Sequence, residues 1–353
     1  MHIYDLQELK ASTNNFSSSR LIGKGSHGSV YKGILKNGNL VAIKKQSLGL
    51  QKLQDNTKLE NEANILSSVH PNPCLIKLLG ISHDDYGNKI IVTQYMPNGT
   101  LHDLLHVSAT DLPWRKRVEI ALRIAEGVRL LHESNPPVVH RDIKSANILF
   151  DKIYSATLAD FGLAVRLGNE VEANKLPAGT IGYIDPSYTT PGKLSTKIDV
   201  FSYGVVLLEL LSGRRAMDVR KSPPSIVEWA LPLIERGRAM EVCDERIRLP
   251  RGSMARAIRR LVHVAARCVS PKESVRPTMG EIVAILESLT VEPIQLPISF
   301  RNVVFKMMGR RRFGFNGRVK DCGTCGEHDK GSGNNISKGR LLVREILADI
   351  TLK

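Results

Sequence analysis

The strongest chemical signal in the chain is a short polar segment, His140-Arg141-Asp142-Ile143-Lys144-Ser145-Ala146-Asn147. Asp142 can accept the proton of a hydroxyl group, Lys144 can neutralise a phosphoryl group during its transfer, and Asn147 can bind a metal ion. Each of these residues, taken alone, is more often an ordinary surface polar residue. Their order and spacing together favour a phosphoryl-transfer site in which Asp142 is the base.

A second acidic motif, Asp160-Phe161-Gly162, begins thirteen residues after Asn147. Mg²⁺ prefers oxygen ligands, and a carboxylate, an amide oxygen and phosphate oxygens together meet that preference. The sequence therefore predicts a metal site formed by Asn147 and Asp160. We expect Mg²⁺ there, with Mn²⁺ as an acceptable substitute.

A glycine-rich segment, Gly23 to Val30, has the pattern G-x-G-x-x-G-x-V. Glycine lets backbone N–H groups approach phosphate oxygens closely. The pattern alone is weak, because three glycines at fixed spacing recur by chance in roughly one chain in ten of this length. A plain hairpin turn is the simplest interpretation. A dinucleotide-binding loop would run from a strand into a helix, whereas this loop leads into another β-prone segment.

Lys44 ends a β-prone segment, Val41-Ala42-Ile43-Lys44. Alternate residues of a strand share a face, so Ala42 and Lys44 would both face a nucleotide. Glu62 falls on the apolar face of the next predicted helix, whereas Glu60 falls on another side. The pattern predicts an ion pair between Lys44 and Glu62, with Glu60 as a solvated carboxylate.

The elements around these motifs separate into a β-rich part and a helical part. The expected strands are Leu21–Ile22, Ser29–Tyr31, Leu40–Ile43, Leu75–Ile81 and Lys89–Tyr95. The expected helices are one capped by Asp55, Asn56 or Thr57, then Leu101–His106, Trp114–His132, Val200–Leu211, Ile226–Glu235, Met254–Val269 and Thr278–Leu289. This segregation predicts an α+β fold with two lobes, a small one over about residues 16–93 and a larger one over about 97–290. Residues 1–15 would be a lead-in, and residues 291–353 a flexible tail.

Charge and cysteine content limit the class of protein. The chain has 353 residues and a net charge of +15. From Ser299 to Lys353 there are twelve Lys or Arg and five Asp or Glu, so this tail alone carries about half of the net positive charge of the chain. This uneven distribution does not favour a nucleic-acid-binding protein. Five widely spread cysteines are typical of reduced thiols, and no secretory signal is apparent, so we expect a cytoplasmic protein.

Taken together, the motifs closely resemble the protein-kinase signature over roughly residues 16 to 290. Further stretches are similar to plant receptor-like kinases and their receptor-like cytoplasmic relatives, closest to the crinkly-type branch. They are residues 8–17, Gly179-Thr180-Ile181-Gly182-Tyr183-Ile184-Asp185-Pro186, residues 199–205 and Arg276-Pro277-Thr278-Met279. The resemblance implies a bilobal kinase that transfers the γ-phosphate of ATP to protein Ser or Thr hydroxyls. A pseudokinase scaffold on the same fold is the alternative.

The resemblance also assigns roles to individual positions. Thr180 would help Asp142 and Lys144 to present the substrate hydroxyl, Thr93 would be the gatekeeper, and Gln94 to Met96 would contact adenine. The expected nucleotide site comprises Ile22, Gly23, Lys24, Gly25, Ser26, His27, Gly28, Ser29, Val30, Ala42, Lys44, Glu62, Thr93, Gln94 and Met96. Expected partners are protein substrates and a membrane receptor kinase.

Two departures from the family pattern concern the segment after Gly162. Ser187 stands where such kinases carry a Glu that pairs with the Arg at position 276, so either another acid serves Arg276 or its side chain is partly solvated. The segment from Leu163 to Gly179 has no Ser, Thr or Tyr to receive an activating phosphate. We hypothesise that Glu170 or Glu172 replaces that phosphate beside Arg141. Solvated loop charges are an equal alternative.

The tail carries two weaker signals. The mixed basic and apolar residues 305–315 suit an anionic membrane surface such as the inner face of the plasma membrane, a nuclear signal, or a solvated extension. Cys322 and Cys325 form a lone C-x-x-C with only His328 nearby, which is fewer than the four ligands of a structural zinc site.

Overall fold

The computed structural model describes residues 1–25, 28–46, 57–108, 111–168, 176–188 and 194–290. These residues belong to one compact unit, Met1–Val291. The expected nucleotide contacts Ser26 and His27, the carboxylates Glu170 and Glu172, and the tail motifs lie outside the described residues.

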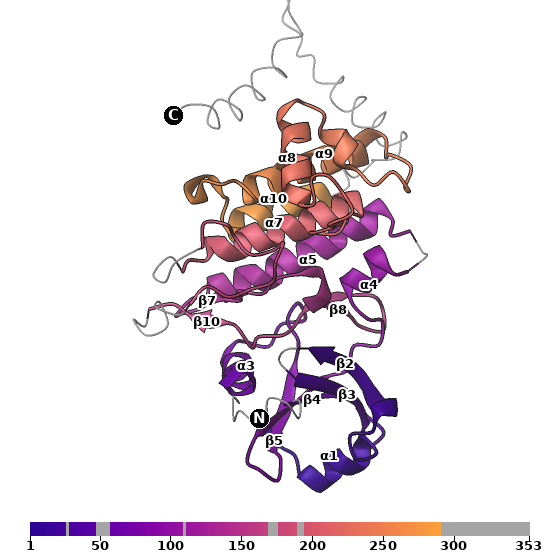
Figure 1. Ribbon diagram of the computed structural model, residues 1–353, viewed down its shortest axis with the longest axis vertical. Helices are drawn as coiled ribbons and strands as arrows, with labels where there is room; N and C mark the ends of the chain where they lie inside the picture. Colours follow the sequence, from indigo (N-terminus) through magenta and orange to yellow (C-terminus); the bar gives the residue numbers. More distant parts are fainter. Residues whose placement is uncertain (26–27, 47–56, 109–110, 169–175, 189–193, 291–353) are drawn as a thin grey trace, which may run out of the picture. The chain divides into compact units, whose positions relative to one another are not determined.

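The small lobe is built on one mixed sheet of strand order β1-β5-β6-β4-β3-β2. Its strands are β1 His2–Ile3, β2 Leu21–Gly25, β3 Gly28–Ile34, β4 Leu40–Lys45, β5 Leu78–His83 and β6 Lys89–Gln94. Its helices are α1 Leu6–Ser12, the 3-10 turn η1 Ser18–Arg20 and α3 Thr57–Ser68. The strand β1 runs parallel to β5, and the other neighbours are antiparallel. Figure 1 shows α3 standing apart from α1, on the side of the lobe that faces the helical part.

The first residues of the chain are a packed part of this lobe. The strand β1 extends the sheet at β5, and a side chain at Gly80 would come within 2.2 Å of the carbonyl oxygen of His2, so the close approach requires glycine there. Leu9 on α1 is fully buried with Val41 and Ile43. The segment expected as a lead-in therefore completes the sheet and its apolar core.

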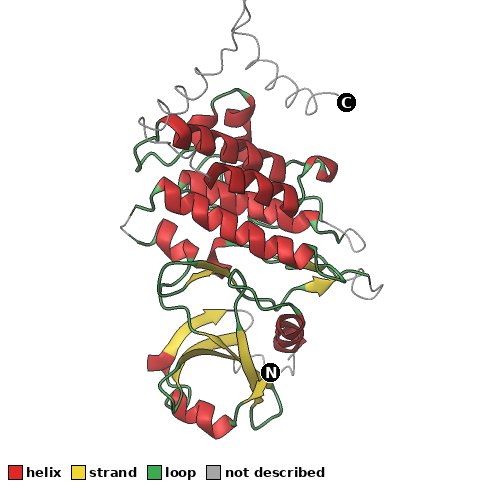
Figure 2. Ribbon diagram, turned by 180° about the vertical axis from the view of Figure 1, so that it is seen from behind, coloured by secondary structure: helices red, strands yellow, loops and turns green. Residues whose placement is uncertain are grey.

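The large lobe is mainly helical (Figure 2). Its helices are α4 Leu101–His106, α5 Trp114–His132, α7 Lys197–Ser212, α8 Ile226–Glu235, α9 Gly252–Cys268 and α10 Met279–Thr290, with 3-10 turns η2 Ser145–Asn147, η3 Ala239–Val242 and η4 Glu273–Val275. Two small antiparallel sheets pair β7 Val138–Val139 with β10 Val165–Arg166, and β8 Ile148–Phe150 with β9 Ala156–Leu158.

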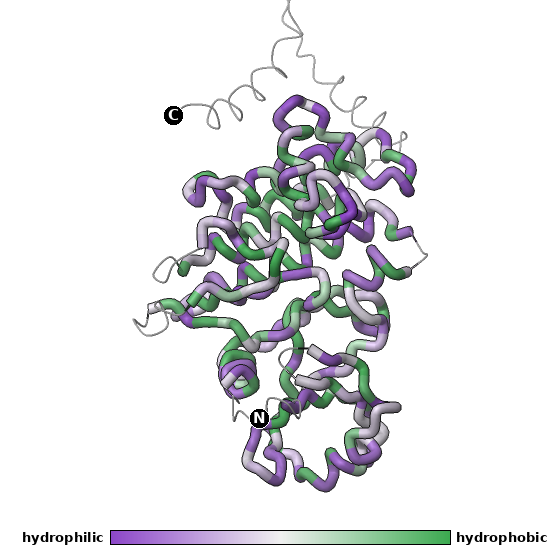
Figure 3. The backbone as a smooth tube through the Cα atoms, viewed as in Figure 1, coloured by the Kyte–Doolittle hydropathy of each residue, from purple (hydrophilic) through white to green (hydrophobic). Residues whose placement is uncertain are grey.

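The helix α7 is the centre of the large lobe. Described residues on every side of it, from Ile198 to Ser212, are buried. Its all-round apolar sequence explains this position, because a helix without a polar face must be covered on all sides. Figure 3 shows hydrophobic residues running through the central helices and hydrophilic residues in the loops at their ends. Among the described residues, no helix has both the length and the apolar character needed to cross a bilayer.

The structure confirms the α+β class with a β-rich lobe and a helical lobe. The helices Leu101–His106, Trp114–His132 and Ile226–Glu235 begin and end where the sequence predicts. The strand predicted over Leu75–Ile81 begins later, at Leu78. Leu75 instead forms an isolated bridge with Leu158 of the large lobe, in which the N–H of Ile76 donates to the carbonyl of Leu158 and the N–H of Leu158 donates to the carbonyl of Cys74.

Candidate active site

The loop that carries Asp142 is held in place by Asp199, a residue in the first turn of α7. The Asp199 carboxylate accepts the backbone N–H groups of His140, at 2.7 Å, and of Arg141, at 2.8 Å. It also bonds the ring of His132 at 3.0 Å. These bonds hold Arg141 at a φ of +67°, a conformation that non-glycine residues rarely adopt. Burial alone would raise the pKa of Asp199, but the bonds from His132 and His140 outweigh it and the pKa is lowered.

Asp142 lies at the centre of a compact polar cluster. One carboxylate oxygen accepts the Thr180 hydroxyl at 2.6 Å, and the other accepts the Lys144 ammonium at 2.7 Å. Lys144 Nζ also donates to Thr180 Oγ1 at 2.9 Å. The amide nitrogen of Asn147 donates to both the carbonyl and the carboxylate of Asp142, at 2.9 and 3.1 Å. The structure thus brings Asp142, Lys144 and Thr180, which the sequence analysis placed at the reacting hydroxyl, together with Asn147, the expected metal ligand.

Lys44 on β4 joins the two lobes. Its Nζ lies 2.6 Å from Glu62 Oε2 on α3 and 2.8 Å from Asp160 Oδ1. Burial alone would lower the pKa of Lys44, but the charges of Glu62 and Asp160 more than compensate, so the pKa is raised and the side chain stays protonated. The predicted pair of Lys44 and Glu62 is present, and it includes Asp160 as a third member.

A cavity of about 590 Å³ lies between the lobes and contains most of the expected nucleotide site. Of the expected residues, it is lined by Ile22, Gly23, Lys24, Gly25, Gly28, Val30, Ala42, Lys44, Glu62, Thr93, Gln94 and Met96, together with Lys144, Asn147 and Asp160. Ser29 does not line it, because residues alternate along β3 and Ser29 is turned into the lobe. Gly28 has a φ of +134°, and a side chain there would meet the carbonyl oxygen of Lys45 at 2.4 Å.

The lining residues fit an adenine nucleotide with a divalent metal ion. The apolar residues Ile76, Ile91 and Leu149 line one part of the cavity, and charged groups line another. Sequence reasoning missed these three, because apolar residues of strands are normally read as core. Lys44 faces two carboxylates, so this cluster has a net charge of −1 that a cation would neutralise. Because the amide nitrogen of Asn147 is bonded to Asp142, its amide oxygen is the atom that remains for a metal.

Arg141 is bonded to backbone carbonyls of the segment after Gly162. Its guanidinium donates to the carbonyl oxygen of Leu176 at 2.5 Å and to that of Leu163 at 3.5 Å. Its Nε is buried without a hydrogen-bond partner among the described residues. The proposed replacement of a phosphate by Glu170 or Glu172 stays a prediction, because both residues lie outside the described part of the chain.

The structure decides between the two alternatives for Arg276. The side chain is fully buried, so partial solvation is excluded. Its guanidinium forms a bidentate ion pair with Asp185, in which Nη2 lies 3.0 Å from Oδ1 and Nη1 contacts Oδ2. Asp185, two residues before Ser187, is therefore the acid that serves Arg276. The sequence contained both residues, but nothing in their spacing pointed to this pair.

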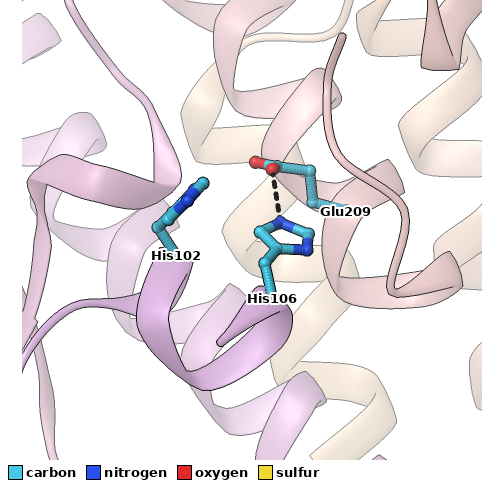
Figure 4. Close-up of side chains that lie close together, drawn as sticks. All are labelled: His102, His106 and Glu209. Atoms are coloured by element: carbon cyan, nitrogen blue, oxygen red, sulfur yellow. Dashed lines mark hydrogen bonds and ion pairs between the residues drawn. The ribbon is translucent and has the colours of Figure 1, made fainter. Parts of the chain in front are cut away.

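A second buried network connects α4 and α7 to the loop of Asp142. Glu209 accepts hydrogen bonds from Tyr183 at 2.8 Å and Ser145 at 3.2 Å, and bonds the ring of His106 at 3.0 Å. Figure 4 shows His106 directed at Glu209, with His102 one turn earlier on α4. The three side chains have the donor types of a metal site. Because the carboxylate is already bonded and Arg215 lies 3.4 Å from His102, we assign the cluster a structural role.

Comparisons with known proteins agree with this geometry. Residues 16–285 match the family model described as "Protein kinase domain". A serine/threonine-protein kinase-like protein of Arabidopsis thaliana is 45% identical over 336 residues, which cover 88% of this chain and 95% of the relative. A second protein of that description from the same plant is 43% identical, covering 80% of this chain and 78% of the relative. A receptor-like cytoplasmic serine/threonine-protein kinase of Gossypium barbadense is 36% identical, covering 82% of this chain and 64% of the relative.

Proposed function

Because the chain belongs to the protein kinase family, within the plant receptor-like and receptor-like cytoplasmic group, we propose that it transfers the γ-phosphate of ATP to serine or threonine hydroxyls of proteins. The observation that carries the proposal is the cluster of Asp142, Lys144 and Thr180, whose reactive atoms lie within 2.9 Å of one another in pairs. The placement in the crinkly-type branch stays a prediction.

Asp142 is the proposed base. Its carboxylate is held by Lys144 and Asn147 and accepts the hydroxyl of Thr180, so a hydroxyl group can reach it. A carboxylate so placed accepts the proton as the hydroxyl attacks, which is worth about two to four orders of magnitude in rate. Lys144 then stands next to the developing negative charge and stabilises it.

ATP and a divalent metal supply the phosphoryl group and the positive charge that neutralises it. We propose Mg²⁺ as the metal, held by Asp160 and by the amide oxygen of Asn147. Lys44 would bind phosphate oxygens while Glu62 holds it in place, and Gln94 to Met96 would contact adenine. The glycine loop would cover the phosphates with its backbone N–H groups.

A scaffold that binds partners without catalysis is the rival function. It would tolerate the loss of Lys44, Glu62, Asp142, Asn147 or Asp160, yet all five are present and oriented toward the same cavity or cluster. Ser187 was the one residue in its favour. Since Asp185 pairs with Arg276, that substitution leaves no unpaired charge behind.

The experiment is a γ-phosphate transfer assay on a generic protein substrate with the wild type, Lys44→Ala and Asp142→Asn. We expect transfer by the wild type, with a fall of at least about a hundredfold in kcat for Asp142→Asn. Thermal unfolding of each variant checks that the fold is kept. Equal rates in all three proteins would favour the scaffold.

The finer expectations about place and partners are also proposals. We propose a cytoplasmic kinase that acts with a membrane receptor kinase, and whose basic residues 301–353 contact anionic lipid. Cosedimentation with phosphatidylserine liposomes, compared between the full chain and one lacking residues 301–353, tests the lipid contact. Unchanged binding after the deletion would rule out that role for the tail.

A further inference from the structure

Asn61 on α3 faces the backbone that follows Asp160. Its amide nitrogen lies 2.8 Å from the carbonyl oxygen of Ala164, 3.2 Å from that of Gly162 and 3.3 Å from that of Phe161. Carbonyl oxygens only accept hydrogen bonds, so the NH₂ group of Asn61, and not its oxygen, must face them. The orientation of this half-buried side chain is therefore fixed by its surroundings.

The neighbouring residue Glu62 binds the same segment as a hydrogen-bond acceptor, whereas Asn61 binds it as a donor. Its carboxylate accepts a backbone hydrogen bond from Phe161 while it also holds Lys44. One turn of α3 thus binds both the N–H and the C=O groups after Asp160.

Asp160 itself has an unfavourable backbone conformation. Its φ is +65°, in the left-handed region that non-glycine residues rarely occupy. Such a conformation costs on the order of 1–3 kcal/mol and persists only where neighbouring contacts enforce it. Lys44 fixes the carboxylate of Asp160, but the backbone on its C-terminal side is held by Asn61 and Glu62.

We propose that Asn61 is a positioning residue that orients Asp160 for the divalent metal, so that binding of the metal–nucleotide complex depends on an amide at position 61. The inference rests on the proposed function, because it takes Asp160 as a metal ligand. Asn61 acts through the backbone of residues 161–164 and does not contact the nucleotide cavity. Because Asn61 links α3 to the backbone that follows Asp160, a shift of α3 would also change the orientation of Asp160.

The chain offers a matched control on the same helix. Asn64 lies three residues further along α3, lines the same shallow surface pocket as Asn61, and is exposed. Asn61→Asp replaces the donor by a carboxylate that would repel three carbonyl oxygens. Asn64→Asp introduces the same charge nearby without touching them. Asn61→Ala removes the donor and introduces no charge.

The experiment measures the affinity of the full chain for ADP by fluorescence, once in EDTA and once in saturating Mg²⁺. The ratio of the two affinities reports how much the metal contributes. We expect that ratio to fall at least about fivefold in Asn61→Asp and Asn61→Ala, the equivalent of one lost hydrogen bond of roughly 1 kcal/mol. Binding in EDTA should stay within about twofold of the wild type, and Asn64→Asp should keep the wild-type ratio.

Three results would overturn the inference. They are an unchanged ratio in both Asn61 variants, an equal loss of affinity with and without Mg²⁺, and an equal loss in Asn64→Asp. Should Asn61→Asp fail to fold, Asn61→Ala decides alone. A wild type whose ADP affinity does not respond to Mg²⁺ would instead count against the proposed kinase function, so the two failures are distinguishable.

Discussion

The large-lobe half of the active site is anchored by fully buried charged side chains, whereas the small-lobe half, formed by Lys44 and Glu62 together with Asp160 of the large lobe, keeps partial contact with solvent. In the large lobe, the side chains of Asp199, Asp185 and Arg276 are at most 1% exposed. In the small-lobe half, Lys44 is 14% exposed and Asp160 is 23% exposed, and only Glu62, at 5%, is buried. The same kinds of charged group therefore sit in two different environments.

This difference in burial predicts different roles for the two sets of ion pairs: the buried pairs stabilise the fold, and the partly exposed pairs can rearrange. A buried ion pair is costly to break, because removing one partner leaves an unpaired charge in the protein interior. A partly solvated pair can open at lower cost, since water replaces the lost contact. We therefore expect the loop of Asp142 to be permanently positioned, and the arrangement of Lys44, Glu62 and Asp160 to be the part that can change.

The largest effect should come from breaking the buried pair in the large lobe. Asp185→Asn leaves Arg276 uncompensated and should lower the free energy of unfolding by about 3–5 kcal/mol, measured by urea denaturation. Ser187→Glu is the control, and it should give no gain in Tm because Arg276 already has its acid. A clear gain would mean that Asp185 does not satisfy Arg276.

A smaller effect is expected at Asp199, and it depends on pH. Its pKa is lowered from the usual 3.8 by folding, so the stability it contributes is present above that value and is lost as the pH falls through the folded-state pKa. Asp199→Asn should cost about 2–3 kcal/mol at pH 7 and flatten the decline in stability at pH values below 4. Parallel pH curves for the two proteins would contradict this account.

A change in the small-lobe half should cost less stability than Asp185→Asn. Lys44→Met should lower the free energy of unfolding by about 1–2 kcal/mol, while phosphoryl transfer falls to background. Asp160 keeps contact with solvent, and burial already raises the pKa of Glu62, so Glu62 can take up a proton once its partner is lost. Urea denaturation and the transfer assay are run on the same preparation. A loss of stability as large as that of Asp185→Asn would remove the distinction between the two halves.

The smallest effect is expected from the carboxylates that are proposed to replace a phosphate beside Arg141. Replacing both Glu170 and Glu172 by Ala should lower kcat by up to about fivefold, the equivalent of roughly 1 kcal/mol, without changing the unfolding midpoint. The assay is made on phosphatase-treated protein, so that no added phosphate can compensate. Full activity of the double variant would show that the two residues are only solvated loop charges.

Much of the fold and the central cluster could be predicted from the sequence, because they depend on local patterns. Trp114–His132 is long and amphipathic, and Asp142, Lys144 and Asn147 belong to one short segment. Thr180 lies 38 residues after Asp142 in the chain, and only the family resemblance placed it beside them. The pairs that sequence reasoning missed join distant positions, such as Asp185 with Arg276 and Asn61 with Ala164. A polar residue outside an apolar stripe, as Asn61 is, looks solvated until the element that packs against it is known.

The ion pair between Asp185 and Arg276 has a consequence for how relatives are compared. The family pattern would place the acid that pairs with this arginine at position 187, whereas this chain supplies it from position 185. Once Asp185 carries the pair, position 187 is released from that constraint and can drift without loss of the contact. A residue that departs from the family motif is then poor evidence that a relative has lost its fold or activity. The more informative test is whether another carboxylate in that relative can form the ion pair with the arginine.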